Sequence, residues 1–195
     1  MYDYLSKNKS LLIEKSVEKK QGIRDWYVLF RSRYEELFNK PKIIFRQTGD
    51  RIIAAKDNEV GYYCIDSVNV GQLKSKYHHL LDYLIGILNS RLIVFYYQEI
   101  SQEKNRVLAQ VKPQRIRSLP IRIGTDSEIE SLYGLVKNIN SLKKNNLKAN
   151  TKPLEDQMDI MVYKLYNLTY KEVEIIDPQI GSIISKENYE KFQLQ

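Results

Sequence analysis

Short apolar runs separated by turn residues predict a small β-sheet in the first half of the chain. The runs at 42–45, 51–55 and 62–70 are rich in β-branched and aromatic residues, which is typical of strands. Gly49 followed by Asp50 marks the first turn, and the polar segment KDNEVG marks the second. The segment at 25–38, with apolar residues at about helical spacing, precedes them and is expected to pack on the core.

A helical period replaces these runs from Tyr77 onward. Apolar residues form a stripe between Leu80 and Leu88, after which Asn89 and Ser90 interrupt it. Because serine is a favourable N-cap residue, Ser90 is expected to begin a second helix. A proline inside the later run at 115–123 predicts an extended edge segment rather than a central strand.

The last third of the chain predicts two helices joined by a short polar loop. Apolar residues recur along one face from Ile129 to Leu142, and again from Leu154 to Leu168. Such a pair suits an antiparallel helical hairpin over 126–168, whose stripes most simply serve intradomain packing. We therefore expect an α+β fold, with a small mixed curved sheet and packed helices followed by a C-terminal helical hairpin.

Charge is distributed unevenly between these parts. Residues 1–122 hold 22 Lys and Arg against 13 Asp and Glu, whereas residues 123–195 hold 9 against 11. The basic first part suggests a polyanionic partner, with solubility alone as the competing explanation. The single cysteine, Cys64, excludes an internal disulfide and fits a reducing, cytoplasmic location. We see no signal peptide and no apolar run of membrane-spanning length, so no membrane partner is expected.

Residue patterns of the common enzyme classes are missing from the sequence. The two histidines, His78 and His79, are adjacent and do not match H-E-x-x-H, and no glycine-rich phosphate loop or G-x-S-x-G elbow occurs. A nuclease interpretation would use Asp3, Glu18 and Lys20, but such a site needs carboxylates held rigidly. We therefore predict no catalytic residue, no metal ligand and no bound cofactor in this chain.

Two polar segments carry the residue types that read DNA. Asn and Gln match adenine, Arg and Lys match guanine and phosphates, and Asp and Glu match cytosine. The segment at 98–110, which also includes Glu99 and Glu103, is predicted to be a reading loop, and the turn at 46–51 is a second candidate. Solvated loops with no DNA contact are the alternative. The predicted DNA-binding residues are Arg46, Gln47, Thr48, Asp50, Arg51, Lys74, Lys76, Tyr77, Gln98, Gln102, Lys104, Asn105, Arg106, Gln110, Lys112 and Arg115. Among these, Lys112 and Arg115, together with Arg117, are expected to hold phosphates.

Three motifs in order resemble a known family. They are WYVLFRSRYEELFNKPKIIFRQTGD, then LDYLIGILNSRLIVFYYQ with a later IRSLPI, and finally MDIMVYKLYNLTYKEVEIID. Together, over about residues 24–178, they resemble the TaqI-like C-terminal specificity domain of adenine-specific restriction–modification methyltransferases. Two positions depart mildly from that pattern: Arg122 stands where a second proline is common, and Asn167 stands where glycine is common.

The resemblance implies a specificity role within a larger enzyme. It implies recognition of a short duplex DNA sequence for an N-terminal methyltransferase domain, joined by a nuclease in type II single-chain restriction–methylation enzymes. S-adenosylmethionine would belong to that methyltransferase domain and not to this chain. The corresponding domain plan has a mobile leader at 1–23, a target recognition domain at 24–123, the hairpin at 124–170 as a spacer or docking element, and a tail at 171–195. The alternative is a protein-interaction module that dimerises or docks through the hairpin.

Overall fold

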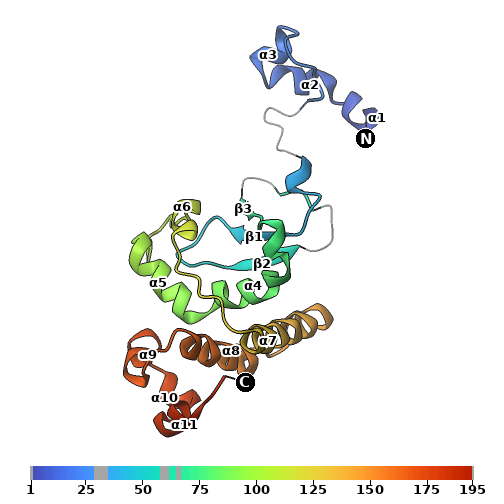
Figure 1. Ribbon diagram of the computed structural model, residues 1–195. Helices are drawn as coiled ribbons and strands as arrows, with labels where there is room; N and C mark the ends of the chain where they lie inside the picture. Colours follow the sequence, from blue (N-terminus) through green and yellow to red (C-terminus); the bar gives the residue numbers. More distant parts are fainter. Residues whose placement is uncertain (1, 29–34, 58–61, 65–66, 195) are drawn as a thin grey trace. The chain divides into compact units, whose positions relative to one another are not determined.

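A computed structural model describes residues 2–28, 35–57, 62–64 and 67–194 (Figure 1). The chain divides into two compact units, Met1–Leu37 and Phe38–Gln195. Each unit is described by itself below.

The first unit is built from short helices. These are α1 (Tyr2–Ser6), α2 (Lys9–Glu14), α3 (Val17–Lys20) and the 3₁₀ helix η1 (Glu35–Leu37). None of α1 to α3 buries a residue, and the ring of Trp26 packs instead against neighbouring aromatic rings 5.5–5.6 Å away. The expected leader is therefore helical, while much of the expected helix at 25–38 falls at 29–34, outside the described residues.

A three-stranded sheet forms the centre of the second unit. Its strands are β1 (Lys42–Arg46), β2 (Ala54–Asp57) and β3 (Val68–Gly71), in the order β2-β1-β3. Both pairings are antiparallel, so the described strands form an antiparallel sheet where we expected a mixed one. The predicted α+β class is confirmed, because this sheet accompanies several helices.

Strand positions differ from the predicted ones in two places. The first strand lies where it was predicted, but the second begins three residues late, at Ala54, and Ile52 before it is buried in the core. The third is confined to Val68–Gly71, and residues 65 and 66 of the predicted run lie outside the described part of the chain. A fully buried ion pair between Lys42 and Asp57 joins the start of β1 to the end of β2.

The helix break at Asn89 and Ser90 is confirmed. The 3₁₀ helix η2 (Ser75–Leu80) leads into α4 (Leu81–Asn89), and α5 (Arg91–Ser101) follows. The Ser90 hydroxyl accepts a hydrogen bond from the backbone N–H of Ile93, as expected for an N-cap.

The extended edge predicted at 115–123 is wrong for its first residues. Pro113 begins a short helix, α6 (Pro113–Arg117), a position where proline is favourable. The residues that follow, up to the start of the next helix, belong to no helix or strand. Instead, the Tyr83 hydroxyl donates to Arg122 O at 2.9 Å, and the Tyr166 hydroxyl donates to Pro120 O at 2.7 Å.

Helices occupy the whole C-terminal part. They are α7 (Asp126–Asn145), α8 (Lys152–Leu165), α9 (Tyr170–Ile176), α10 (Ile180–Ile183) and α11 (Lys186–Lys191). Helix α7 packs against both α4 and α8, and a capping box between Thr125 and Glu128 begins it. Residues 171–195, named a tail in the domain plan, include most of α9 and all of α10 and α11.

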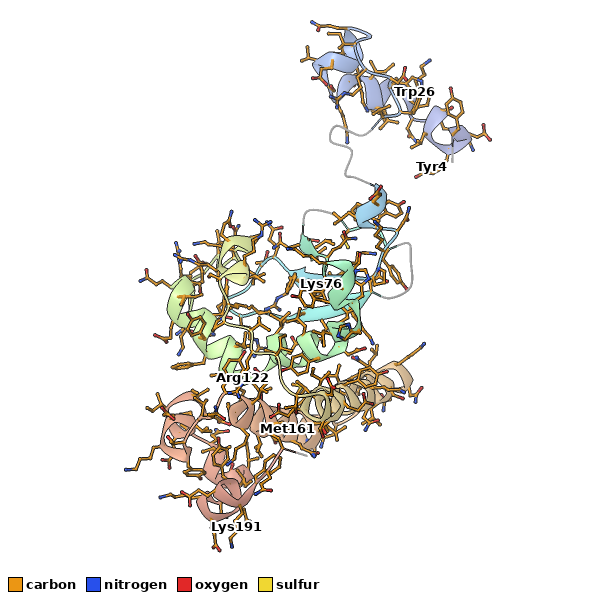
Figure 2. All side chains as sticks on the ribbon, viewed as in Figure 1. Tyr4, Trp26, Lys76, Arg122, Met161 and Lys191 are labelled. Atoms are coloured by element: carbon orange, nitrogen blue, oxygen red, sulfur yellow. The ribbon has the colours of Figure 1, made fainter. Side chains whose placement is uncertain are left out.

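Two hydrophobic cores hold the second unit together. The larger core joins the sheet to α4, α5, α7 and α8, and it includes Leu132 and Val136. Met161 of α8, labelled in Figure 2, belongs to the same core. The smaller core lies between α8 and the last three helices, with Tyr163 and Tyr189 at its centre. The apolar stripe of the hairpin is thus used inside the chain, which leaves the dimerisation alternative without support.

No single helix in the described residues has the length and hydropathy to cross a membrane. The pair Ser75–Asn89 and Arg91–Ser101 passes on length and composition when the two are taken together, but it is bent by 67°.

Candidate nucleic-acid interface

The two polar segments predicted to read DNA lie side by side. Thr48 forms an isolated antiparallel bridge with Gln110. On either side of it, Gly49 N donates to Ala109 O at 2.9 Å, and Val111 N donates to Gln47 O at 2.7 Å. Residues 46–51 and 102–112 therefore form one surface, which we call the platform.

A buried carboxylate fixes the longer half of the platform. Glu103 is 2% exposed, and its Oε1 lies 2.6 Å from Lys112 Nζ and 3.0 Å from Arg106 Nη1. Its Oε2 accepts a hydrogen bond from Gln110 N at 3.2 Å. The hydrogen bond from Lys112 is the largest cause of a pKa of Glu103 below its usual range, and the Gln110 amide and Arg106 add to it. Glu103 is therefore a positioning residue of this loop and is not exposed for base reading.

Tyr97 on α5 fixes the end of the same loop through two hydrogen bonds. This side chain on α5 is fully buried, and its hydroxyl donates to Gln110 O at 3.2 Å and accepts from Lys112 N at 2.9 Å. Gln102 ends α5 with a φ of 55°, and Asn105 has a φ of 61°. These left-handed residues turn the chain sharply, so the loop begins at 102 and not at 98 as predicted.

The turn at 46–51 depends on a glycine. Gly49 has a φ of +148°, and a Cβ atom added there would lie 2.5 Å from Nη2 of Arg46. The Arg46 guanidinium thus lies close over the turn, while Arg46 N donates to Ile53 O at 3.2 Å and continues the pairing of β1. A side chain at position 49 would displace one of the main cationic groups of the platform.

Most predicted site residues of the platform are exposed to solvent. Gln47 and Asp50 are half-buried, and Gln98 is half-buried on α5. Directly after the platform, Arg115 and Arg117 are exposed on α6. The exposed predicted residues of this region are Arg46, Thr48, Arg51, Gln102, Lys104, Asn105, Arg106, Gln110, Lys112 and Arg115.

The structure does not bring Lys74, Lys76 and Tyr77 to the platform. Strand β3 runs antiparallel to β1, so Val68 pairs with Arg46 and Gly71 pairs with Ile43. The segment after Gly71 therefore starts from the opposite end of the sheet, roughly 10 Å along the strand, and Lys76 lies at that end in Figure 2. There Lys76 Nζ lies 4.6 Å from the centre of the Tyr77 ring and lowers the Tyr77 pKa, mainly through a side-chain hydrogen bond.

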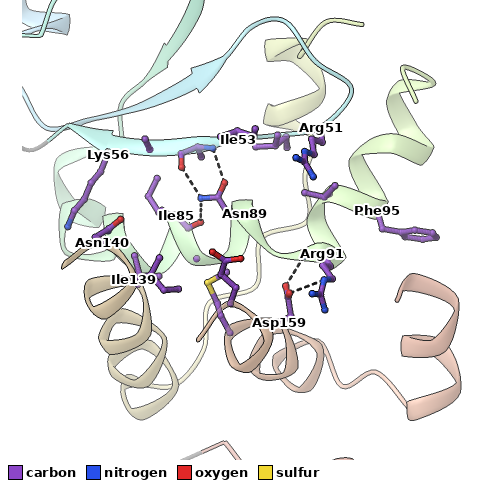
Figure 3. A pocket seen from close by; sticks show the side chains of 18 of the residues that line it. Arg51, Ile53, Lys56, Ile85, Asn89, Arg91, Phe95, Ile139, Asn140 and Asp159 are labelled. Carbon is purple, nitrogen blue, oxygen red and sulfur yellow. Dashed lines mark hydrogen bonds and ion pairs between the residues drawn. The ribbon is translucent and has the colours of Figure 1, made fainter. Parts of the chain in front are cut away.

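A cleft with a volume of about 1080 Å³ begins beside the platform (Figure 3). Arg51 and Lys104, one from each half of the platform, line it together with Gln98. Its walls include apolar side chains from β2, α5 and α7, among them Phe95 and Ile139. The sequence pattern did not predict this cleft, because its walls come from segments far apart in the chain.

Asn89 holds the edge strand of the sheet beside this cleft. Its side chain accepts from Ala54 N at 2.9 Å and donates to Ala54 O at 2.8 Å and to Ile85 O at 3.0 Å (Figure 3). The amide group thus pairs with β2 as a neighbouring strand would. The interruption at Asn89 and Ser90 was predicted only as a helix break, and this second role was missed.

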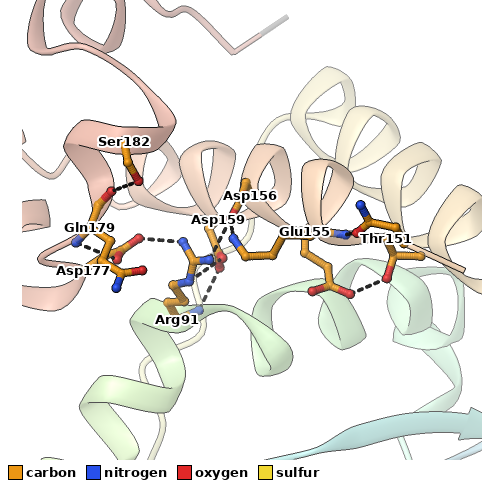
Figure 4. A network of polar contacts seen from close by, with 10 residues as sticks. Arg91, Thr151, Glu155, Asp156, Asp159, Asp177, Gln179 and Ser182 are labelled. Atoms are coloured by element: carbon orange, nitrogen blue, oxygen red, sulfur yellow. Dashed lines mark hydrogen bonds and ion pairs between the residues drawn. The ribbon is translucent and has the colours of Figure 1, made fainter. Parts of the chain in front are cut away.

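Arg91 joins the second and third sequence motifs (Figure 4). Its guanidinium lies 2.6 Å from Asp156, 3.4 Å from Asp159 and 2.5 Å from Asp177, and its backbone N–H donates to Asp159 at 2.8 Å. Burial raises the pKa of Asp159 to about 7, although the Arg91 backbone N–H and guanidinium act against it. Burial also acts to lower the pKa of Arg91, but the three carboxylates outweigh it and raise that pKa.

The described residues gather no set of three or more His, Cys, Asp or Glu side chains suited to a metal ion. The residues of the nuclease interpretation, Asp3, Glu18 and Lys20, lie on the short helices α1 and α3, and Glu18 pairs with Arg24 at 2.9 Å. His78 Nε2 lies 2.9 Å from the carbonyl of Leu73. These positions give the nuclease interpretation no rigid carboxylate scaffold.

The fold and the platform are those of an α+β module that presents loops on a scaffold of strands and helices. A family model described as the TaqI-like C-terminal specificity domain matches residues 4–121. The chain belongs to this family, and its role is therefore that of a specificity domain in restriction–modification. The match contains the platform, whereas the third motif of the resemblance lies beyond it. No curated protein matches the chain.

Proposed function

We propose that this chain recognises a short sequence in duplex DNA through the platform. The observation that carries the proposal is the joining of residues 46–51 and 102–112 by backbone hydrogen bonds into one basic, amide-rich surface. Membership of a specificity-domain family supports it. Loops on a rigid scaffold are also a common location of binding residues.

Different side chains of the platform have different proposed roles. The amides of Gln102, Asn105 and Gln110 suit adenine, because an amide pairs with both adenine edge groups in the major groove. Arg46 and Arg51 suit guanine, while Lys104, Lys112 and Arg115 suit phosphates. Arg51 and Lys104 also line the cleft, so its rim extends the basic surface beyond the platform.

In this proposal the chain recognises DNA for a methyltransferase domain that lies N-terminal to it, in a type II restriction–modification enzyme of the cytoplasm. A nuclease domain joins that arrangement in single-chain restriction–methylation enzymes. S-adenosylmethionine would bind to the methyltransferase domain and supply the methyl group there. This chain itself would perform no chemical step.

Selection of a randomised duplex DNA pool by the 195-residue chain at low salt tests the proposal. We expect one short sequence to be enriched, with an affinity that falls as salt increases. Recovery of no bound DNA would contradict the proposal.

A pair of double variants tests whether the platform and the adjoining helix α6 carry the binding. Lys104→Ala with Arg115→Ala removes two exposed cations near the proposed base contacts, so the slope of log affinity against log salt should decrease by about 1.8. The matched control is Lys148→Ala with Lys171→Ala, two exposed lysines of the C-terminal part. An equal decrease in both double variants would show that the binding is not specific to the platform.

A further inference from the structure

Two adjacent apolar side chains project from the tip of the platform loop. Val107 is 98% exposed and Leu108 is 81% exposed, and the neighbouring exposed residues Lys104, Asn105 and Arg106 are all polar. Leaving both apolar side chains in water forgoes the stabilisation that burial would give. Single exposed apolar residues are common, but an adjacent pair at the tip of a basic loop is suited to contact with another molecule.

The loop that carries this pair is fixed at both ends. On one side Glu103 is buried and bonded to Gln110, Arg106 and Lys112. On the other side Ala109 is 5% exposed, and its carbonyl accepts the hydrogen bond from Gly49. Arg106 N also donates to Glu103 O at 3.2 Å, which closes a turn immediately before the tip. Val107 and Leu108 are therefore presented by a supported turn.

The charges around the tip indicate which partner it meets. Lys104 and Arg106 precede it in the chain, and Lys112 and Arg115 follow it, while the nearby carboxylate of Glu103 is already paired. Phosphates surround the apolar base stack of a DNA duplex, so cations around an apolar tip match this arrangement. Apolar side chains of this kind enter between base pairs in several DNA-binding proteins and partly unstack one step.

We infer that Val107 and Leu108 form an apolar wedge that enters one base step of the bound duplex and unstacks it. The inference rests on the proposed DNA binding and adds a deformation of the DNA to it. The surrounding cations hold the backbone on either side, and the supported turn resists the force of restacking. Contact with a thymine methyl group in the major groove is the competing role of the same side chains.

Fluorescence of 2-aminopurine tests the wedge. The base is placed at each successive position of a duplex recovered by the selection described above, and its emission rises when it loses stacking. With the wild-type chain we expect a several-fold increase at one step only. Val107→Ser with Leu108→Ser should abolish the increase and weaken binding about tenfold, which equals ~1.4 kcal/mol.

Two further variants give matched controls. Leu147→Ser replaces an exposed leucine, 84% accessible, in the loop between α7 and α8, and it should keep the full fluorescence increase. Leu108→Met keeps an apolar side chain at the tip and should retain the increase where the serine variants do not. Loss of the increase in Leu147→Ser as well would overturn the assignment to the tip.

The remaining outcomes separate this inference from the proposed function. Tight, salt-dependent binding by the wild-type chain with no fluorescent step would overturn the wedge and leave DNA recognition intact. Thymine in the duplex can also be replaced by uracil, which lacks the methyl group. If this replacement weakens binding by the wild-type chain as much as the double serine variant does, and no step is unstacked, methyl contact replaces the wedge. Absence of binding to any duplex would overturn both.

Discussion

The platform and the Arg91 cluster use charge in opposite ways. In the platform, one buried carboxylate, Glu103, is held by Lys112 and Arg106, and the surrounding cations remain exposed. In the cluster, one guanidinium is surrounded by Asp156, Asp159 and Asp177 between α5, α8 and the end of α9. The first arrangement shapes a loop and displays positive charge, whereas the second uses its charges to join helices.

This difference explains the uneven charge of the sequence. The near-neutral composition of residues 123–195 accompanies two apolar cores and an internal ion network. The basic excess of residues 1–122 includes the platform, where few acids neutralise it. We therefore expect damage to Arg91 to reduce stability, and damage to Glu103 to reduce DNA binding.

The largest expected effect of a single substitution at constant pH comes from Arg91→Ala. Removal of the guanidinium leaves three carboxylates close together, and Asp159 among them is buried. The free energy of unfolding should fall by about 3 kcal/mol, as measured by urea denaturation. Lys191→Ala, which removes an exposed ion pair on α11, is the control and should change little. Equal stability of the two variants would contradict the structural role given to Arg91.

The next effect is a dependence of the free energy of unfolding on pH that arises from Asp159. Its pKa is raised to about 7 in the folded chain and is about 3.9 in an unfolded one. Between these values the folded state holds a proton that the unfolded state has released, so this residue makes stability fall as pH rises from about 4 to about 7. The slope from this residue reaches up to about 1.4 kcal/mol per pH unit.

Asp159→Asn, followed by urea denaturation across that pH range, isolates this contribution. Asparagine does not titrate, yet its side-chain oxygen can still accept from the Arg91 backbone N–H. The variant should therefore show a flatter dependence than the wild type. If stability changed with pH equally in the two proteins, the pH dependence could not be assigned to Asp159.

The smallest stability change and the sharpest functional one are expected from Glu103→Gln. The amide keeps the shape of the side chain but loses both ion pairs, so stability should fall by only about 1 kcal/mol. Hydrogen exchange of residues 102–112 should accelerate, and DNA affinity should drop because the platform is no longer held. A variant with normal affinity and slow exchange would show that Glu103 is not needed to shape the loop.

Regular periodicity explains which parts of the fold were predictable from sequence. The stripes of α4, α7 and α8 are long enough for the pattern alone to define them, and Ser90 is a recognisable N-cap. The strand at 42–46 combines β-branched and aromatic residues. By contrast, Pro113 and not Pro120 decides the structure after the loop, because a proline at the first turn of a helix favours it.

The candidate site was predictable by residue type and not by arrangement. Polar composition identified both halves of the platform, but the bridge from Thr48 to Gln110 depends on the whole intervening fold. Glu103 was grouped with the base-reading carboxylates because the sequence alone does not reveal that its side chain is buried. Its position among Lys104, Arg106 and Lys112 was the available signal, since a lone acid among cations tends to pair. Lys74 and Lys76 were predicted as DNA-binding residues because they are cationic. The register of β3 on β1 shows that their segment begins at the other end of the sheet.

The amide of Asn89 also affects how the protein behaves in a crowded solution. Strand β2 lies at an open edge of the sheet, and such an edge can accept a strand from another chain and start aggregation. Asn89 already occupies the N–H and the carbonyl of Ala54, so an incoming strand finds these groups taken. The residue at the break between two helices therefore also shortens the stretch of β2 to which a second strand could pair.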